Sequence, residues 1–124
     1  MQETYTLKAD WITTFGSPNN GDEVYNLAID DSAAYVSGRS GDRHFIQKFD
    51  LSGASIWEKI EYPIARLNHP ASLAISKDGA IYSGGTYKFG SHYLGSTRIQ
   101  TARSSWDSWL HKWNSSGEII KESY

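Results

Sequence analysis

The fold is decided by the stretch Leu27-Ala28-Ile29-Asp30-Asp31-Ser32-Ala33-Ala34-Tyr35-Val36-Ser37-Gly38. It aligns without a gap on Leu73-Ala74-Ile75-Ser76-Lys77-Asp78-Gly79-Ala80-Ile81-Tyr82-Ser83-Gly84, 46 residues later. Six of the twelve aligned pairs are identical. In both copies a turn rich in Asp, Ser or Gly separates two short apolar runs, which is the pattern of a β-hairpin. The sequence therefore predicts a repeated hairpin.

Two further blocks extend the repeat. Trp11 returns as Trp57 at the same spacing of 46, whereas the block 45–53 returns as 109–117 at a spacing of 64. The difference of 18 residues predicts an insertion in the second copy, a long connection at about 87–105. We expect one all-β unit over 1–124, with repeat 1 at about 11–56 and repeat 2 at about 57–124.

Each copy is predicted to form four strands. In the third, Phe45 and Phe49 point to one face and Ile46 to the other, and both faces are therefore partly apolar. Blades stacked around an axis bury both faces of each sheet, as in a β-propeller. The predicted fold is all-β, with two four-stranded antiparallel propeller-like blades and a further N-terminal strand at 5–15. A β-sandwich or a strand-exchanged dimer is the alternative.

Composition agrees with an all-β fold and excludes several functions. The 124 residues include 11 Gly, 5 Trp, 8 Tyr and 4 Phe, and aromatic side chains favour strands. The net charge of −2 gives no basic patch for nucleic acid. No apolar stretch approaches the ~20 residues of a membrane span. The absence of cysteine excludes disulfides, thiolate metal sites and cysteine nucleophiles.

The repeat resembles a known family on specific residues. These are Trp11-x3-Phe15-Gly16, Leu27-Ala28-Ile29-Asp30, Tyr35-Val36-Ser37-Gly38, Lys48-Phe49-Asp50, Ser52-Gly53 and Trp57. They are similar to the SBBP-type bacterial β-propeller repeat over nearly the whole chain, from Trp11 to about Lys121. Lys121 departs from the pattern, because the family would place a third Trp there. The resemblance implies a structural or binding unit and favours an extracellular or cell-envelope location. The first residues of the chain, however, lack the apolar stretch of a signal peptide.

Two blades are too few to close a ring, since propellers close with about 4–8. Their outer faces would leave apolar patches exposed. We therefore expect a homo-oligomer, or the remaining blades of a longer chain, as the partner.

No catalytic or metal-binding constellation is evident. The histidines are scattered, with no paired zinc spacing, and the acidic pairs lie in predicted turns. His111, in the third strand of the second copy, is predicted to be a buried polar position. Lys48 and its equivalent Lys112 are predicted to pack along a neighbouring blade, with each ammonium group reaching a carbonyl or carboxylate group. The sequence thus predicts no enzyme, no cofactor and no metal.

The insertion contains the candidate binding residues. Long loops on a rigid β scaffold often carry function, and aromatic rings with arginine can stack a sugar or bind an acidic protein. The predicted function is a non-enzymatic binding or scaffolding module. A lectin-like carbohydrate-binding oligomer is the alternative, and a hydrolase of unknown substrate is the weakest hypothesis. The candidate ligand-binding residues are Tyr87, His92, Tyr93, Arg98, Arg103 and Trp106.

Overall fold

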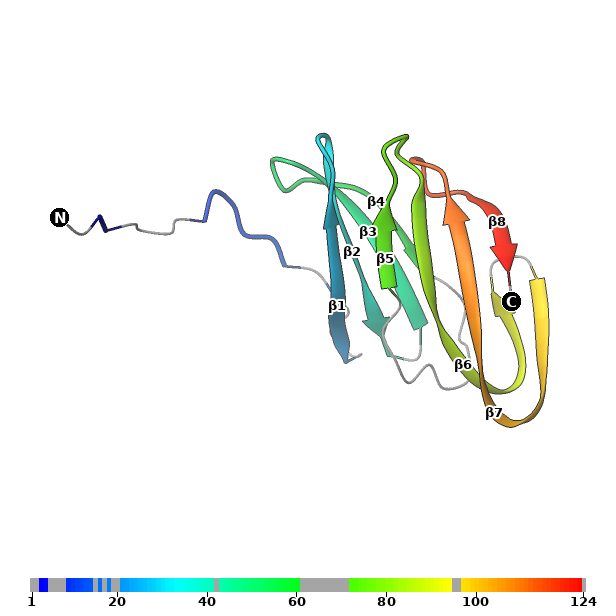
Figure 1. The fold of residues 1–124 in the computed structure, drawn as a ribbon. Helices are drawn as coiled ribbons and strands as arrows, with labels where there is room; N and C mark the ends of the chain where they lie inside the picture. Colours follow the sequence, from blue (N-terminus) through cyan, green and yellow to red (C-terminus); the bar gives the residue numbers. More distant parts are fainter. Residues whose placement is uncertain are drawn as a thin grey trace.

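Eight strands form two four-stranded antiparallel sheets in the computed structural model (Figure 1). The structure describes residues 3–4, 9–14, 16, 18, 21–41, 43–60, 72–94 and 97–123. For 87–94, 97–107 and 122–123 it describes the backbone alone. The all-β prediction is confirmed, as are the two four-stranded sheets. Within the described residues, no helix is long and apolar enough to cross a membrane.

Each sheet is a meander in chain order. Sheet 1 consists of β1 (Asp22–Ile29), β2 (Ala33–Ser40), β3 (Arg43–Asp50) and β4 (Ser55–Ile60). Sheet 2 consists of β5 (Ser72–Ile75), β6 (Ile81–Leu94), β7 (Thr97–Trp113) and β8 (Ile119–Ser123).

The prediction of an N-terminal strand at 5–15 is wrong for residues 9–14, the part of that segment described without a gap. Residues 9–14 are described and form no strand. A strand needs a neighbour to pair its backbone groups, and β1 and β4, the two edge strands of sheet 1, do not pair with this segment among the described residues. In Figure 1 the segment leaves sheet 1 on the side of β1 that faces away from sheet 2.

The insertion is a hairpin rather than the expected loop. β6 and β7 continue to Leu94 and Thr97, and their ladder runs up to that pair of residues. The register shifts between Lys88 and Gly90, where residues 102–105 face Phe89 alone. Extending two antiparallel strands satisfies the backbone hydrogen bonds that a long loop would leave to water.

The register corrects the gapless alignment of the second strand. Ile29 lies opposite Ala34, whereas Ile75 lies opposite Ile81. The equivalent of Ala34 is therefore Ile81, at a spacing of 47 rather than 46. The turn of the second copy holds one more residue. The true equivalent of Tyr35 is Tyr82, and each of these rings lies under a lysine ammonium, that of Lys48 at 5.4 Å and that of Lys112 at 5.5 Å.

The two sheets stack with unlike faces in contact. We call the face with Phe45 and Phe49 in sheet 1, and with Trp109 and Trp113 in sheet 2, the front face. The opposite face, with Tyr35 and Lys48 or Tyr82 and Lys112, is the back face. The back face of sheet 1 packs on the front face of sheet 2 in one cluster of Ala33, Tyr35, Ile46, Ile81 and Trp113. A two-fold symmetric pair would bring like faces together. Here the sheets follow one another in the same orientation instead.

This stacking leaves one face of each sheet uncovered by the other sheet. On the front face of sheet 1, Leu27 is 70% and Ile29 68% exposed. On the back face of sheet 2, Leu110 is also exposed. One cluster of the core therefore lies between the sheets, Phe45 and Phe49 are also buried on the front face of sheet 1, and other large apolar side chains remain on the outside.

Equivalent turns close the third and fourth strands of each sheet. In sheet 1, Asp50 Oδ1 accepts hydrogen bonds from the backbone N–H groups of Ser52 and Ala54. In sheet 2, Asn114 Oδ1 accepts the same pair from Ser116 and Glu118. The hydrogen bond from the Ser52 hydroxyl group, followed by those from the backbone, lowers the pKa of Asp50.

We expect Asp50→Asn to fold normally but to change how stability depends on pH. Asn114 shows that an amide can close this turn. Because the pKa of Asp50 is lowered, its charge stabilises the fold at pH values above the ordinary carboxyl pKa. This stabilisation is lost as the pH falls through the pKa that Asp50 has in the folded state. Thermal melts should show a lower Tm for the variant near pH 7, and a gap to the parent that closes between about pH 5 and pH 2. A gap that widens in acid would contradict this assignment.

Candidate functional site

The backbone of the insertion hairpin holds all six candidate binding residues, but their side chains lie outside the described part of the structure. The register places Tyr93 opposite Arg98, His92 opposite Ile99, and Tyr87 opposite Asp107. It separates the remaining two: Trp106 pairs with Lys88, and Arg103 lies in the stretch that faces Phe89. Tyr93 and Arg98 therefore lie directly opposite each other on the two paired strands. A glycan or protein ligand at this hairpin stays a prediction.

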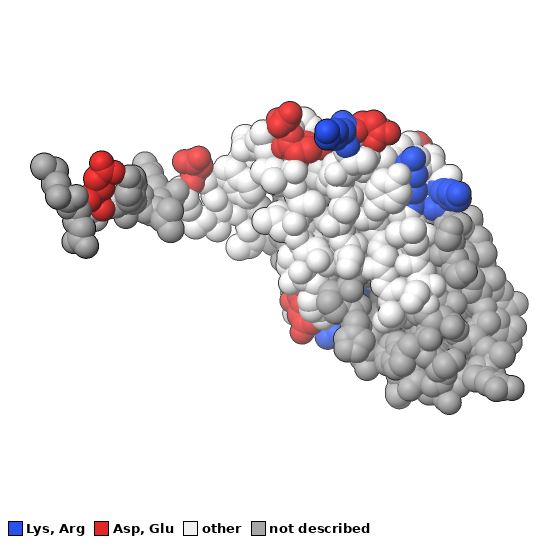
Figure 2. Space-filling model, viewed as in Figure 1, with Lys and Arg blue, Asp and Glu red and all other residues white. Residues whose placement is uncertain are grey.

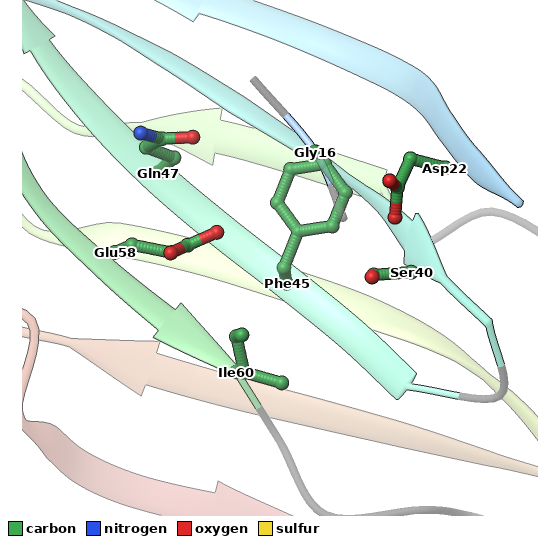
Figure 3. A pocket seen from close by; sticks show the side chains of 7 residues that line it. All are labelled: Gly16, Asp22, Ser40, Phe45, Gln47, Glu58 and Ile60. Atoms are coloured by element: carbon green, nitrogen blue, oxygen red, sulfur yellow. The ribbon is translucent and has the colours of Figure 1, made fainter. Parts of the chain in front are cut away.

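The described side chains form a different hollow, on the front face of sheet 1 (Figure 3). Its volume is about 380 Å³. Each of the four strands of sheet 1 contributes to it, and the N-terminal segment adds a glycine. The lining residues are Gly16, Asp22, Ser40, Phe45, Gln47, Glu58 and Ile60.

Gln47 is the most informative residue of this hollow. Only 7% of it is exposed. Its Nε2 donates to the Ser55 hydroxyl oxygen at 3.1 Å, while its Oε1 accepts no hydrogen bond within the described residues. Figure 3 shows this oxygen on the side of the amide that faces Phe45. A buried acceptor without a donor is costly, at about 1–3 kcal/mol, so the site is suited to receive a donor.

The chemistry of the hollow is dominated by acceptors around an aromatic ring. The carboxylates of Asp22 and Glu58 project from β1 and β4, on either side of Phe45 in Figure 3. Glu58 lies directly opposite Gln47 in the ladder and is exposed. Such a site favours a ligand group that donates hydrogen bonds and carries positive charge.

A second hollow lies between the β1–β2 and β5–β6 turns, on an edge where Figure 2 shows acidic and lysine side chains together. Asp30, Asp31 and Asp78 line it. Partial burial raises the pKa of Asp30, but hydrogen bonds from Ser32, Ala33 and Tyr35 outweigh it and leave the pKa lowered. The Ser76 hydroxyl group, followed by the Ala80 backbone, lowers the pKa of Asp78. Two of the three carboxylates are thus engaged in closing their own turns. Among the described residues, no three Asp, Glu or His side chains are grouped so that they could hold a metal ion.

Tyr35 connects the turn of Asp30 to the core. Its hydroxyl group donates to Asp30 Oδ2 at 3.2 Å. Burial, followed by the Asp30 charge and this hydrogen bond, raises the pKa of Tyr35 to about 12. The phenol therefore stays neutral at physiological pH and acts as a structural donor.

Lys48 and the buried His111 lie in the contact between the sheets, whereas the equivalent Lys112 lies on the uncovered back face of sheet 2, with its ammonium group 5.5 Å from the centre of the Tyr82 ring. Lys48 Nζ donates to the Ser115 carbonyl oxygen of sheet 2 at 3.1 Å, which confirms the role predicted for it. His111 is fully buried, with its ring centroid 4.7 Å from that of Trp109 and 5.8 Å from that of Trp113. The prediction of a buried polar position is confirmed.

Two tryptophans dock on equivalent turns, a feature that the sequence alone does not predict. Trp57 Nε1 donates to the Ser115 carbonyl oxygen at 3.0 Å, and Trp11 Nε1 donates to that of Leu51 at 2.9 Å. Each indole also covers the glycine that lies two residues after the residue whose carbonyl oxygen accepts its hydrogen bond. A Cβ atom would meet Trp57 at 3.2 Å on Gly117 and Trp11 at 2.7 Å on Gly53. We call each carbonyl–glycine pair a tryptophan slot. The signal in the sequence is that Trp11 recurs as Trp57 and Gly53 recurs as Gly117, but at the unequal spacings of 46 and 64 residues.

Gly117→Ala is expected to weaken the contact between the sheets, whereas Gly79→Ala is its matched control. Both glycines have positive φ, 79° and 83°, and an alanine costs about 1–2 kcal/mol in that conformation. At Gly117 the new methyl group would also lie 2.7 Å from the Lys59 side chain, but around Gly79 nothing lies within 4 Å. Urea unfolding should therefore show a larger loss for Gly117→Ala. Equal losses would mean that the tryptophan slot contributes little.

Searches against protein-family models, curated proteins and solved structures found no match for this chain. The resemblance to SBBP-type repeats therefore stays a prediction that rests on the sequence. A fold of this kind does not by itself define a function, which depends on the faces, tryptophan slots and hollow described above.

Proposed function

We propose that this chain is a non-enzymatic binding or scaffolding module of the β-propeller type, completed by self-association or by further blades. The observation that carries the proposal is the contact of unlike faces between the two sheets. The back face of sheet 1 already packs on the front face of sheet 2 inside the molecule. The front face of sheet 1 and the back face of sheet 2 are therefore left uncovered at the two ends of the stack. Such head-to-tail contacts continue until they close a ring.

The uncovered faces support an interaction role. Leu27, Ile29 and Leu110 are large apolar side chains that a sheet within a stack would bury. The carboxylates with lowered pKa values, Asp30, Asp50 and Asp78, serve turns rather than a cleft suited to acid–base chemistry. Both features favour binding over catalysis.

Sedimentation equilibrium combined with hydrophobic-dye fluorescence tests this proposal. We expect the chain either to form a defined oligomer or to bind the dye strongly through its uncovered faces. Leu27→Lys should reduce both signals, because it charges the front face of sheet 1. Ala54→Lys, in an exposed turn, is the control and should leave both unchanged. A monomer at all concentrations that binds no dye would refute the proposal.

A further inference from the structure

The N-terminal segment occupies the position of a fourth strand that lacks its sheet. Trp57 lies on β4, the fourth strand of sheet 1, and fills the slot on sheet 2. Trp11 fills the equivalent slot on sheet 1 with the same indole hydrogen bond, but its segment is paired with neither sheet among the described residues. The segment thus relates to sheet 1 as β4 relates to sheet 2.

We propose that the front face of sheet 1 binds a three-stranded antiparallel sheet that takes residues 11–14 as its fourth strand. This inference deepens the proposed function and rests on it, because it names the partner of one uncovered face. The partner presents a back face like that of sheet 1: an aromatic ring, an aliphatic side chain and a lysine. That lysine would donate to the Leu51 carbonyl oxygen beside Trp11, just as Lys48 shares the Ser115 carbonyl oxygen with Trp57.

The hollow on the front face defines one more group of the partner. In the contact between the sheets, the His44 ring of sheet 1 lies 5.3 Å from the Trp109 ring on the front face of sheet 2. The equivalent of Trp109 on the front face of sheet 1 is Phe45, which lines the hollow together with Gln47 and Glu58. The partner sheet is therefore expected to insert a donor-bearing side chain, histidine or arginine, between the Phe45 ring and the Gln47 oxygen.

Three observations argue against a second copy of this chain as that partner. Sheet 2 already contains a fourth strand, β8, at the position that the Trp11 segment would take. β8 also carries Lys121 opposite Lys112, where β4 carries Trp57 opposite Lys48. In addition, the residue of sheet 2 equivalent to His44 is Ser108, which faces Thr86 as His44 faces Arg39. A serine would leave the hollow of about 380 Å³ largely unfilled.

A tandem variant tests the proposal with the sheet the chain itself provides. Residues 1–8 are replaced by a copy of residues 21–54, so that the copied β1, β2 and β3 precede Ala9. Two residues then separate the copied turn from Trp11, as two separate Ala54 from Trp57 in the parent. The copied strands carry the back-face residues Tyr35, His44 and Lys48. We expect amide exchange over residues 11–14 to slow at least tenfold relative to the parent chain, and Tm to rise.

The controls separate the parts of the proposal. His44→Ser in the added copy imitates sheet 2 and should retain only part of the protection, because the hollow is no longer filled. Trp11→Ala in the tandem chain should remove most of it. Exchange over 11–14 as fast as in the parent would overturn the proposal. Equal protection in the concentrated parent chain would assign the face to a second copy and overturn the choice of partner. The proposed function is judged separately, by the sedimentation of the parent chain.

Discussion

Trp113→Ala is expected to lower the free energy of unfolding by about 3–5 kcal/mol, a large fraction of the about 5–15 kcal/mol that holds a typical domain folded. Trp113 is 4% exposed and belongs to the cluster that joins the two sheets. Its Nε1 also donates to the buried Ser83 hydroxyl oxygen at 2.8 Å. Alanine would therefore open a cavity between the sheets and leave that hydroxyl group without its donor. Urea unfolding followed by far-UV circular dichroism measures the loss.

Trp11→Ala is the matched control for this prediction. The same side chain is removed, but Trp11 is 40% exposed and makes its described contacts with one turn. We expect a loss of about 1 kcal/mol, the typical value of one hydrogen bond. Equal losses for the two variants would mean that the contact between the sheets does not hold the fold together.

Gly38→Ala is expected to cost about 3 kcal/mol or more and to disrupt the pairing of β1 with β2. A Cβ atom on Gly38 would lie 1.9 Å from the Glu23 carbonyl oxygen. The β1–β2 register shifts between Val24 and Asn26, so the backbone of β1 approaches Gly38 at this irregularity. Because the obstacle is main chain rather than the end of a side chain, one of the two strands has to move.

Gly84→Ala provides the comparison. Gly84 also lies in a second strand, but the nearest atom to its Cβ would be the Trp109 carbonyl oxygen at 3.2 Å, which a small adjustment can relieve. We expect a loss of less than about 1 kcal/mol for an alanine near such a contact. Amide exchange should show faster opening of β1 in Gly38→Ala and little change in Gly84→Ala. The reverse order would contradict the described register.

The sequence predicts the hairpins well because their signals are local. Alternation in 45–49, together with the Asp, Ser and Gly residues of the turns, is sufficient for the strands of sheet 1. The one-residue slip in the second strand escapes detection, because Ala34, Ser37 and Gly38 find identical residues at the wrong spacing. Only the ladder, with Ile29 opposite Ala34 but Ile75 opposite Ile81, reveals it.

The site was less accessible to sequence reasoning than the fold. Asp22, Gln47 and Glu58 come from three strands, and register alone brings them to one hollow. The N-terminal segment illustrates a different limit. Its Trp11 was correctly matched to Trp57, but a strand exists only where a neighbour offers backbone partners, which no propensity within the segment can provide.

The contact of unlike faces has a consequence for how this protein can assemble. Each sheet added to such a stack presents the same uncovered face as the sheet before it, so growth has no internal stopping point unless a ring closes. Open growth of this kind leads to fibres. A segment that already fills the tryptophan slot of the end sheet obstructs the docking of a complete four-stranded sheet there. The Trp11 segment therefore restricts docking on this face to a sheet that leaves the fourth-strand position free, which opposes open growth by copies of this chain.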